Sequence, residues 1–467
     1  HRAAVARNRR TDHGQVAHSS EASAPDQDAR TLAATVLARV TEDGAYASRA
    51  LDAELQRAGL APRDAALSTE IVYGSLRVLP ALDRIIAERL TRADARMDGL
   101  VRATLRAATY QLWHLSRLPT HAIVDESVRG VRNKRGPKLA GFVNAVLRKL
   151  AAARPAQPAP PRALVLPEWT AHTLERALGP ERLARFLDQH ADAPALCLRA
   201  EGERDRLLAQ LRAAVPQASS GETALSPLGI WLRRAGSPRG LPGYADGAFS
   251  VQEEGAQLLG LALGARPRER IADVCAGHGG KTTLIARAVG PQGQLFALDK
   301  DERKLKQIPR ELQRIGLGAV PLELHAVDLS VGTGGLQGGL DRVLVDAPCT
   351  GLGTVQRRPE LLLRLRPEDP ARMAALQRAI LRNAATLVRP GGVLAYAVCS
   401  PTREEGQDVA DAFSAEHPTY RVLHESLCPS LPSPDAGGVL HLGPWLLPQG
   451  ASSAPDAYQL VVWRRED

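Results

Sequence analysis

The stretch RIADVCAGHGGKTTLIARAV, residues 270–289, decides the fold of the larger part of this chain. Its first residues, Arg270–Val274, form a short apolar run that predicts a buried strand, and Thr282–Val289 has helical spacing. The glycines between them let the backbone approach a ligand, and the free amides of a helix N-terminus favour a polar group. The turn therefore predicts a nucleotide-like cofactor. Because it lacks the spacing of both GxGxxG and GxxxxGKS/T, phosphate binding is disfavoured.

Strands and helices alternate in the same way through the rest of the chain. Further predicted strands are 294–298, 321–327, 341–345 and 392–398, and further predicted helices are 303–315 and 370–387. This order predicts a mostly parallel, doubly wound sheet, to which Tyr458–Trp463 adds an antiparallel edge.

The region upstream of this sheet has a different character. Residues 30–152 carry apolar residues at three- and four-residue steps, which predicts a small all-helical domain. A proline-rich run from Arg154 to Pro161 cannot continue a helix and predicts a stiff linker. A helix around Trp169–His190 and short strands such as Ile230-Trp231-Leu232 then predict a small α+β segment. The predicted organisation is a disordered tail (1–29), a helical domain (30–152), a proline-rich linker (153–164), an α+β segment (165–246) and the doubly wound domain (247–467).

Composition narrows the class of protein. The chain has 467 residues, of which 44% are hydrophobic and 24% are charged, so it can bury two or three cores. Its five cysteines form neither a disulfide framework nor a zinc-ligand cluster, and no apolar run is long enough for a membrane span. We therefore expect a cytoplasmic protein without a metal and, because no dimerisation signal is evident, a monomer.

The basic residues are concentrated in one segment. The net charge of the chain is +9, and between Arg96 and Arg154 twelve Arg and Lys residues stand against three Asp and Glu residues. That segment alone therefore carries an excess equal to that of the whole chain. A basic face on a compact domain is typical of a protein that binds a polyanion such as RNA, although a solvated surface in an arginine-rich protein is the alternative.

Two aspartates follow the next two strands of the sheet. Asp299 closes the second strand, where an acidic side chain can accept hydrogen bonds from ribose hydroxyls. Asp328 ends the third strand, where it can accept a hydrogen bond from the amine of an adenine. Either aspartate alone is an ordinary surface residue, but together with the glycine-rich turn they predict a nucleoside cofactor. S-adenosylmethionine fits this arrangement because it carries no phosphate.

The fourth and fifth strands bring Asp346, Cys349 and Cys399 to the same edge of the predicted sheet. A thiolate is a strong nucleophile, and an acid beside it can share a proton with a ring nitrogen. This combination suits attack on carbon 6 of a cytosine, which makes carbon 5 nucleophilic enough to take a methyl group. A single buried cysteine is often only a small hydrophobe, but two at one sheet edge favour a catalytic pair.

Four motifs resemble those of the RNA 5-methylcytosine methyltransferases. They are Phe249–Glu254, Cys275–Thr282, Asp346–Cys349 and Tyr396–Ser400. The helical region resembles the NusB-type RNA-binding domain through Leu67–Arg77, Arg106–Leu112 and Gly141–Arg148. The combination, over residues 30–465, is similar to the layout of the bacterial ribosomal RNA small-subunit methyltransferase B family.

The resemblance implies methylation of carbon 5 of a cytosine in small-subunit (16S) ribosomal RNA through a covalent cysteine–cytosine adduct, before the subunit is fully assembled. It implies that Cys399 is the nucleophile, that Cys349 assists release of the methylated RNA and that Asp346 contacts the base. The S-adenosylmethionine contacts that it implies are Cys275, Ala276, Gly277, His278, Gly279, Gly280, Lys281, Asp299, Asp328 and Asp346.

The chain departs from the family pattern at four places. His278 replaces a rigid proline, Glu405-Gly406 stands for Glu-Asn, Asp456-Ala457-Tyr458-Gln459 stands for Asp-Gly-Phe-Phe, and Arg199-Ala200 stands for Arg-Asn. The first departure predicts a change in loop stiffness and cofactor affinity, and the last predicts a weaker RNA contact. Two alternatives stay open: the same chemistry on a transfer RNA or another ribosomal site, and a non-catalytic RNA-binding assembly factor that retains the fold.

Overall fold

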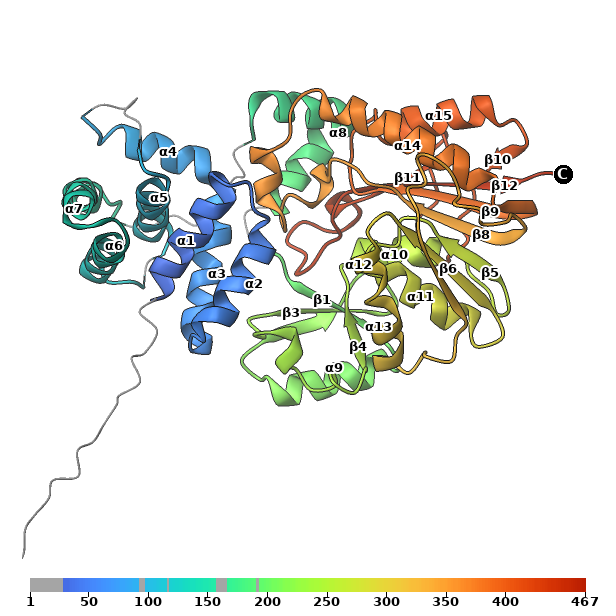
Figure 1. The fold of residues 1–467 in the computed structure, drawn as a ribbon, viewed down its shortest axis with the longest axis horizontal. Coiled ribbons are helices and arrows are strands. Elements are labelled where there is room, and N and C mark those ends of the chain that lie inside the picture. The colour runs from blue at the N-terminus through green and yellow to red at the C-terminus, as the bar shows by residue number, and fades with distance from the viewer. Residues whose placement is uncertain (1–27, 92–96, 116, 157–165, 190–192) are drawn as a thin grey trace, which may run out of the picture.

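The computed structural model describes residues 28–91, 97–115, 117–156, 166–189 and 193–467. Most of the predicted tail and of the predicted proline-rich linker therefore lies outside the described residues. Figure 1 shows a helical domain at one end of the described chain and a larger α/β part at the other. The all-helical and the doubly wound fold classes are both confirmed. Among the described helices, none combines the length and apolar character that a bilayer crossing requires.

The helical domain is built around α1. Its helices within residues 28–156 are α1 (Ala29–Thr41), α2 (Ala47–Ala58), α3 (Pro62–Arg77), α4 (Leu79–Ala87), α5 (Gly99–His114), α6 (Thr120–Arg135) and α7 (Pro137–Ala152). Leu32 and Val36 of α1 are fully buried one helical turn apart, and they pack in one cluster with Ile71 of α3. Asp28 accepts hydrogen bonds from the N–H groups of the first turn at 2.9 Å, so α1 begins at Ala29, one residue before the predicted start.

Helix α8 (Glu168–Gln189) leads from the helical domain to the α/β part. Gly179 has a left-handed φ of 69° and interrupts α8. The buried side chains of Leu174 and Phe186 pack with Leu352, which belongs to the α/β domain. Helix α8 therefore packs as part of the α/β domain, whereas the sequence predicts that it belongs to the α+β segment.

A small antiparallel sheet follows α8. Its elements are β1 (Leu196–Ala200), α9 (Arg204–Ala214), β2 (Ser219–Glu222), β3 (Gly229–Arg233), the 3-10 turn Pro238–Gly240 and β4 (Phe249–Val251), with strand order β2-β3-β1-β4. Because β4 pairs with β1 and Phe249 is buried in the core of this sheet, the sheet extends beyond the predicted boundary at residue 246.

The α/β domain contains the second and larger sheet. Its elements are α10 (Glu254–Ala262), β5 (Arg270–Asp273), α11 (Gly280–Val289), β6 (Gln294–Asp299), α12 (Glu302–Leu305), α13 (Ile308–Arg314), β7 (Leu322–Ala326), β8 (Leu340–Asp346), the 3-10 turns Leu352–Thr354 and Pro359–Leu363, α14 (Asp369–Ala385), β9 (Val388–Val398), α15 (Gln407–Glu416), β10 (Tyr420–Val422), β11 (Val439–Leu442), the 3-10 turn Pro444–Leu446 and β12 (Tyr458–Arg465). The strand order is β10-β12-β9-β8-β5-β6-β7, and β11 also pairs with β12.

The pairing of these strands agrees with the doubly wound prediction. β7, β6, β5, β8 and β9 are parallel neighbours, and β12 runs antiparallel to β9. β12 is not the outermost strand, because β10 and β11 pair with it in turn. The predicted helix over 303–315 is two helices, α12 and α13. Pro309 lies in the first turn of α13, where it lacks an amide hydrogen and cannot continue the preceding helix.

The larger sheet is covered on both faces. One buried cluster joins it to α14 and α15, and a second joins it to α10, α11 and α13. The carboxyl ends of the parallel strands β5, β6, β8 and β9 meet at one edge of such a sheet, where open α/β folds place their ligands. The residues that carry the predicted chemistry lie at these strand ends.

The helical domain contacts the α/β domain through the 3-10 turn Pro359–Leu363. The Glu360 carboxylate accepts a hydrogen bond from the N–H of Ala47 at 3.3 Å, and the Arg364 guanidinium lies 4.2 Å from the ring centroid of Tyr46. Because this turn follows the loop of Cys349, the helical domain is fixed to the segment that carries one of the two predicted thiols.

Candidate active site

The glycine-rich turn connects β5 to α11. Gly277 and Gly279 have left-handed φ values of 54° and 83°. A Cβ atom on Gly279 would lie 2.7 Å from the side chain of Ile308, so both the backbone and the space require glycine there. The predicted cofactor residues from Cys275 to Lys281 therefore form one tight loop at the carboxyl end of β5.

The two aspartates predicted to bind the ribose and the adenine of the cofactor lie in different surroundings. Asp299, the last residue of β6, accepts a hydrogen bond from the N–H of Gly277 at 2.9 Å, which joins it to the glycine-rich turn. Asp328 lies beyond the end of β7 and is exposed, and its carboxylate accepts hydrogen bonds from the N–H and Oγ of Ser330 at 3.0 and 2.5 Å. These hydrogen bonds lower the pKa of Asp328, so its side chain is an anionic acceptor at the rim of the site.

Asp273 is a buried carboxylate to which the sequence analysis assigned no role. Its side chain accepts a hydrogen bond from Oγ1 of Thr282 at 2.7 Å, whereas its Oδ1 has no partner among the described residues. Burial raises the pKa of Asp273 to about 6. The position of Asp273 just before the glycine-rich turn could have identified it as a candidate site residue. Its burial could not be predicted, because it depends on the packing of β5 between β6 and β8.

Lys281 and Asp346 form an ion pair between the glycine-rich turn and the end of β8. Their Nζ and Oδ2 atoms are 2.6 Å apart, and both side chains are largely buried. Burial disfavours the ammonium, but the Asp346 carboxylate outweighs this and raises the pKa of Lys281. Cys399 adds to the same upward shift of the Lys281 pKa, so a positive charge lies within electrostatic reach of that thiol.

Cys349 and Cys399 are brought together as predicted. Cys349 lies three residues after the end of β8 and Cys399 directly follows β9, and their Sγ atoms are 3.0 Å apart. Both are free cysteines. The hydrogen bond with Cys399, followed by burial, raises the pKa of Cys349 well above its ordinary value. Cys349 therefore keeps its proton and can donate it in a hydrogen bond to Cys399.

The donor and acceptor groups of this edge fit S-adenosylmethionine. The acceptors Asp299, Asp328 and Asp346 suit hydroxyl and amine groups, and the Lys281 ammonium is already neutralised by Asp346. A phosphate-bearing cofactor is disfavoured at this edge, because the carboxylates repel a phosphate and the Lys281 ammonium is paired with Asp346.

His278 and Arg199 lie at two of the places where the sequence departs from the family pattern. His278 is exposed, and its Nδ1 atom lies 3.1 Å from Oε1 of Gln307, so this side chain ties the turn to α13 in place of a rigid ring. Arg199 is only 1% exposed and cannot contact RNA directly. Its guanidinium binds Glu201 at 2.5 Å and donates to the carbonyl oxygen of Gly280 at 2.8 Å. Arg199 therefore supports the cofactor turn from behind.

The departures at Gly406 and Gln459 meet in space. A Cβ atom on Gly406 would lie 2.0 Å from Oε1 of Gln459, so the glutamine amide occupies the room that a side chain at 406 would need. The Gln459 amide donates to the carbonyl oxygens of Ser400 and Thr402 at 2.9 and 2.7 Å. It thereby holds the loop that carries Cys399. Neither residue could be linked to the other from the sequence, because β12 pairs with β9 only in the folded sheet.

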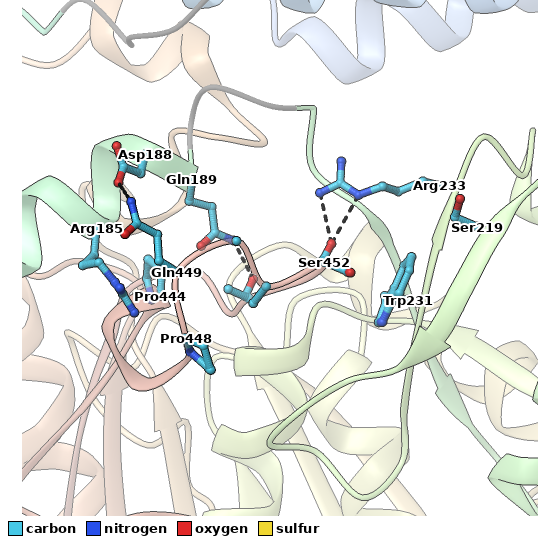
Figure 2. Close-up of a pocket in the computed structure, with 13 residues that line it drawn as sticks. Arg185, Asp188, Gln189, Ser219, Trp231, Arg233, Pro444, Pro448, Gln449 and Ser452 are labelled. Atoms are coloured by element: carbon cyan, nitrogen blue, oxygen red, sulfur yellow. Dashed lines mark hydrogen bonds between the residues drawn. The ribbon is translucent and has the colours of Figure 1, made fainter.

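A cavity of about 330 Å³ has none of the predicted catalytic residues in its lining. Figure 2 shows the residues that line it. The cavity lies between α8, β3 and the segment 444–454. Arg233 donates to the carbonyl oxygen of Ser452 at 3.1 and 3.2 Å, and Gln449 donates to Asp188 at 3.0 Å. These contacts hold the segment 444–454 against α8 and β3. That segment leads into β12, which pairs with β9 beside the loop of Cys399.

Both the helical domain and the α/β domain match families of known proteins. Residues 260–431 match the model of the family described as 16S rRNA methyltransferase RsmB/F, and residues 27–152 match the NusB family. The probable ribosomal RNA small subunit methyltransferase B of Bacillus subtilis is 30% identical over 84% of this chain and 89% of its own length. The ribosomal RNA small subunit methyltransferase B of Vibrio vulnificus is 33% identical over 84% of this chain and 92% of its own.

Two solved structures share the fold. The crystal structure of PH0851 has a TM-score of 0.78 at 21% identity and covers 94% of this chain and 99% of its own. NSun6 from Pyrococcus horikoshii has a TM-score of 0.54 at 17% identity and covers 64% of this chain and 98% of its own. At these identities the likeness shows the fold alone.

Fold, site and comparisons together define an S-adenosylmethionine-dependent rRNA methyltransferase with an N-terminal NusB domain. The chain belongs to the ribosomal RNA small subunit methyltransferase B family, as the identity and coverage of its bacterial relatives show.

Proposed function

We propose that this chain methylates carbon 5 of a cytosine in 16S ribosomal RNA through a covalent adduct between Cys399 and the base. The observation that carries the proposal is the pair of thiols, with Sγ atoms 3.0 Å apart, beside the Lys281–Asp346 ion pair. Carbon 5 of cytosine is a poor nucleophile until a group adds to carbon 6. Two thiols at the site provide one group that adds and a second that is free to assist elimination.

The first step forms the bond between Cys399 and the base. The Cys399 thiolate adds to carbon 6, and the electron pair of the double bond between carbons 5 and 6 shifts through carbon 5 and carbon 4 onto ring nitrogen 3. Asp346, which is held beside the site by its ion pair with Lys281, can share a proton with that ring nitrogen. S-adenosylmethionine held by the glycine-rich turn would supply the methyl group, which carbon 5 would gain as the methyl–sulfur bond of the cofactor breaks and leaves a neutral thioether.

The second step releases the methylated base. Solvent water takes the proton from carbon 5, the electron pair of that carbon–hydrogen bond re-forms the double bond between carbons 5 and 6, and the bond between carbon 6 and Cys399 breaks with its electron pair returning to sulfur. Cys349 contacts the Cys399 sulfur and holds a proton, so it can stabilise the departing thiolate by a hydrogen bond. This assigns Cys349 to release rather than to addition.

The glycine-rich turn and the strand-end carboxylates hold the cofactor in this proposal. The residues are Cys275, Ala276, Gly277, His278, Gly279, Gly280, Lys281, Asp299, Asp328 and Asp346. Asp299 is already joined to Gly277 by a hydrogen bond of 2.9 Å, so the ribose and the turn would be bound as one unit.

The helical domain holds the RNA. Exposed basic residues on α6 and α7, among them Arg132, Lys138 and Arg148, would contact phosphates, and Phe142 is 40% exposed on the same helix as Lys138. The thiols are partly buried, and a cytosine within a duplex cannot reach them, so the target base must be unpaired or flipped out. Naked 16S rRNA is therefore expected to be a better substrate than the assembled small subunit.

The decisive experiment is transfer of labelled methyl groups from S-adenosylmethionine to naked 16S rRNA by the native chain, Cys399→Ala and Cys349→Ala. We expect Cys399→Ala to be inactive and Cys349→Ala to accumulate a denaturant-resistant protein–RNA adduct. Cys428→Ala, which removes a buried cysteine outside the site, is the matched control. If Cys399→Ala and Cys349→Ala both methylate like the control, the thiol mechanism is wrong.

The target is tested separately by mapping 5-methylcytosine in total RNA from cells with and without the protein. Loss of a single 16S rRNA position on deletion is the expected result. Loss of a transfer RNA position would move the same chemistry to another substrate, and no loss at all would favour a non-catalytic assembly factor.

A further inference from the structure

We infer that Glu405 is the positioning residue that sets the distance between the two thiols. The inference rests on the proposed function, because it assigns the glutamate to the geometry of the Cys349–Cys399 pair. Glu405 lies beyond the end of β9, and its side chain is fully buried. In the sequence Glu405 is one of several charged residues between Arg403 and Asp411, and apart from its place in the family pattern no local signal shows that it is buried.

The two carboxylate oxygens of Glu405 accept five hydrogen bonds. Oε1 accepts from the N–H of Thr350 at 2.7 Å and from the Gln377 amide at 3.2 Å. Oε2 accepts from the hydroxyl groups of Thr350 and Ser400, each at 2.6 Å, and from that of Thr402 at 2.9 Å. A buried carboxylate surrounded in this way is satisfied without a cation, since each donor directs a hydrogen at it.

The identity of the donors connects this carboxylate to the thiols. Thr350 directly follows Cys349 and Ser400 directly follows Cys399, and Glu405 binds both of these neighbours. One rigid group therefore spans the loop after β8 and the loop after β9. The separation of 3.0 Å between the Sγ atoms is the geometry that results.

One further contact fixes the backbone of Glu405. The Tyr396 hydroxyl donates to the backbone carbonyl oxygen of Glu405 at 2.5 Å, and its oxygen lies 3.0 Å from Oε1 of Gln377. The Gln377 amide in turn donates to the carbonyl oxygen of Pro348, the residue before Cys349, at 2.9 Å. Gln377 lies on α14 and Tyr396 on β9, so the glutamate is anchored to regular structure as well as to the two loops.

Removing the carboxylate leaves several buried donors without an acceptor. In Glu405→Ala the hydroxyl and amide groups around the site must find new partners, and the two loops lose the group that joins them. In Glu405→Gln the shape is kept, but the amide offers one acceptor oxygen and presents N–H donors to a site built of donors. The loops are then expected to separate slightly in Glu405→Gln and more in Glu405→Ala.

The distance between the thiols can be measured without RNA or cofactor, through their equilibrium with oxidised glutathione. One glutathione disulfide breaks, one bond forms between Sγ of Cys349 and Sγ of Cys399, and the two thiol protons leave on two glutathione molecules. The equilibrium constant gives the effective concentration of one thiol at the other. Mass mapping of the Cys349–Cys399 peptide pair excludes contributions from the other three cysteines, and Cys349→Ala gives the background.

We expect Glu405→Ala to lower this effective concentration at least about tenfold, with Glu405→Gln in between. The turnover number with 16S rRNA is expected to fall about 100-fold in Glu405→Ala, while the KM for RNA is unchanged, because misplacing reacting groups affects the chemical step. Ser400→Ala and Thr350→Val each remove a single link and are expected to give smaller decreases in the same direction. If Glu405→Ala does not fold, the effective concentration of the thiols is measured on Ser400→Ala and Thr350→Val instead.

Glu254→Gln is the matched control, because Glu254 is also a fully buried carboxylate but accepts hydrogen bonds from the N–H groups of Leu225 and Ser226, away from the thiols. It is expected to destabilise the protein while leaving the effective concentration of the thiols unchanged. The inference is overturned if the Glu405 variants lower it no more than Glu254→Gln does. Failure of the proposed function would show instead as normal thiol geometry with no methyl transfer in the native chain.

Discussion

The charged side chains expected to bind RNA on the helical domain are exposed, whereas those that hold active-site segments in the remainder of the chain are buried. Arg132, Lys138 and Arg148 of the helical domain are exposed to solvent, whereas Glu405, Arg199 and Asp273 of the remainder are between 0% and 3% exposed. Exposed charges act at long range, are screened by salt and tolerate replacement. Buried charged groups act through fixed hydrogen bonds, so one replacement changes the geometry of a whole site. The comparison predicts that changes in the first region alter RNA binding and changes in the second alter stability or chemistry.

The largest effect is expected for Arg199→Met. The change leaves Glu201 and the carbonyl oxygen of Gly280 without the partner that lies at 2.5 and 2.8 Å, and breaking a buried charge pair costs about 3–5 kcal/mol. Urea denaturation measures the loss, and calorimetry should show weaker binding of S-adenosylmethionine. Arg287→Met is the control, because Arg287 also pairs with Glu201 at 2.7 Å but is 37% exposed. If the two variants are equally stable, the buried Arg199 contributes no more to stability than the partly exposed Arg287.

The next effect concerns pH and Asp273. Its pKa in the folded protein is about 6, above the ordinary value of 3.8, so the folded state binds the proton more tightly than the unfolded state. The stabilisation is therefore complete below pH 3.8 and is lost as the pH rises through 6. The shift corresponds to at most about 3 kcal/mol. Asp273→Asn should gain that much stability relative to the native chain between pH 4 and pH 7.5, as measured by denaturation at each pH. A difference that does not vary with pH would contradict the assignment.

A smaller effect is expected where Gly406 and Gln459 meet. Gly406→Ala places a Cβ atom 2.0 Å from the amide of Gln459 and should cost about 1–3 kcal/mol, because the amide must leave the carbonyl oxygens of Ser400 and Thr402. The double variant Gly406→Ala/Gln459→Ala relieves the overlap. A double-mutant cycle should therefore give a non-additive term, and additivity would show that the two positions are independent.

The smallest effect per residue is expected on the helical domain. Replacing Arg132, Lys138 and Arg148 by Gln should raise the KM for 16S rRNA about tenfold at most and reduce its dependence on salt, with an unchanged turnover number. The matched control replaces Lys306, Arg382 and Arg421, exposed residues of the α/β domain, by Gln, which changes the net charge equally. If both triple variants behave alike, the charge distribution does not select the RNA-binding face.

Much of the fold followed from local patterns in the sequence. The strands that end at Asp273, Asp299 and Asp346 were all predicted to within a few residues, since apolar runs and glycine-rich turns are local signals. The split of the helix over 303–315 at Pro309 was missed, and so was the pairing of β4 with β1, which depends on a partner strand about fifty residues away.

Local patterns in the chain were enough to place Lys281, Asp346, Cys349 and Cys399 at one sheet edge, because the carboxyl ends of neighbouring parallel strands in a doubly wound sheet lie on the same side. Which polar residues hold that edge in place became evident only in the folded molecule. Glu405, Arg199 and Gln459 look like surface residues in the sequence, and they become interior groups because segments far apart in the chain close over them. Burial is a property of the assembled fold, so a local pattern of residues does not reveal it.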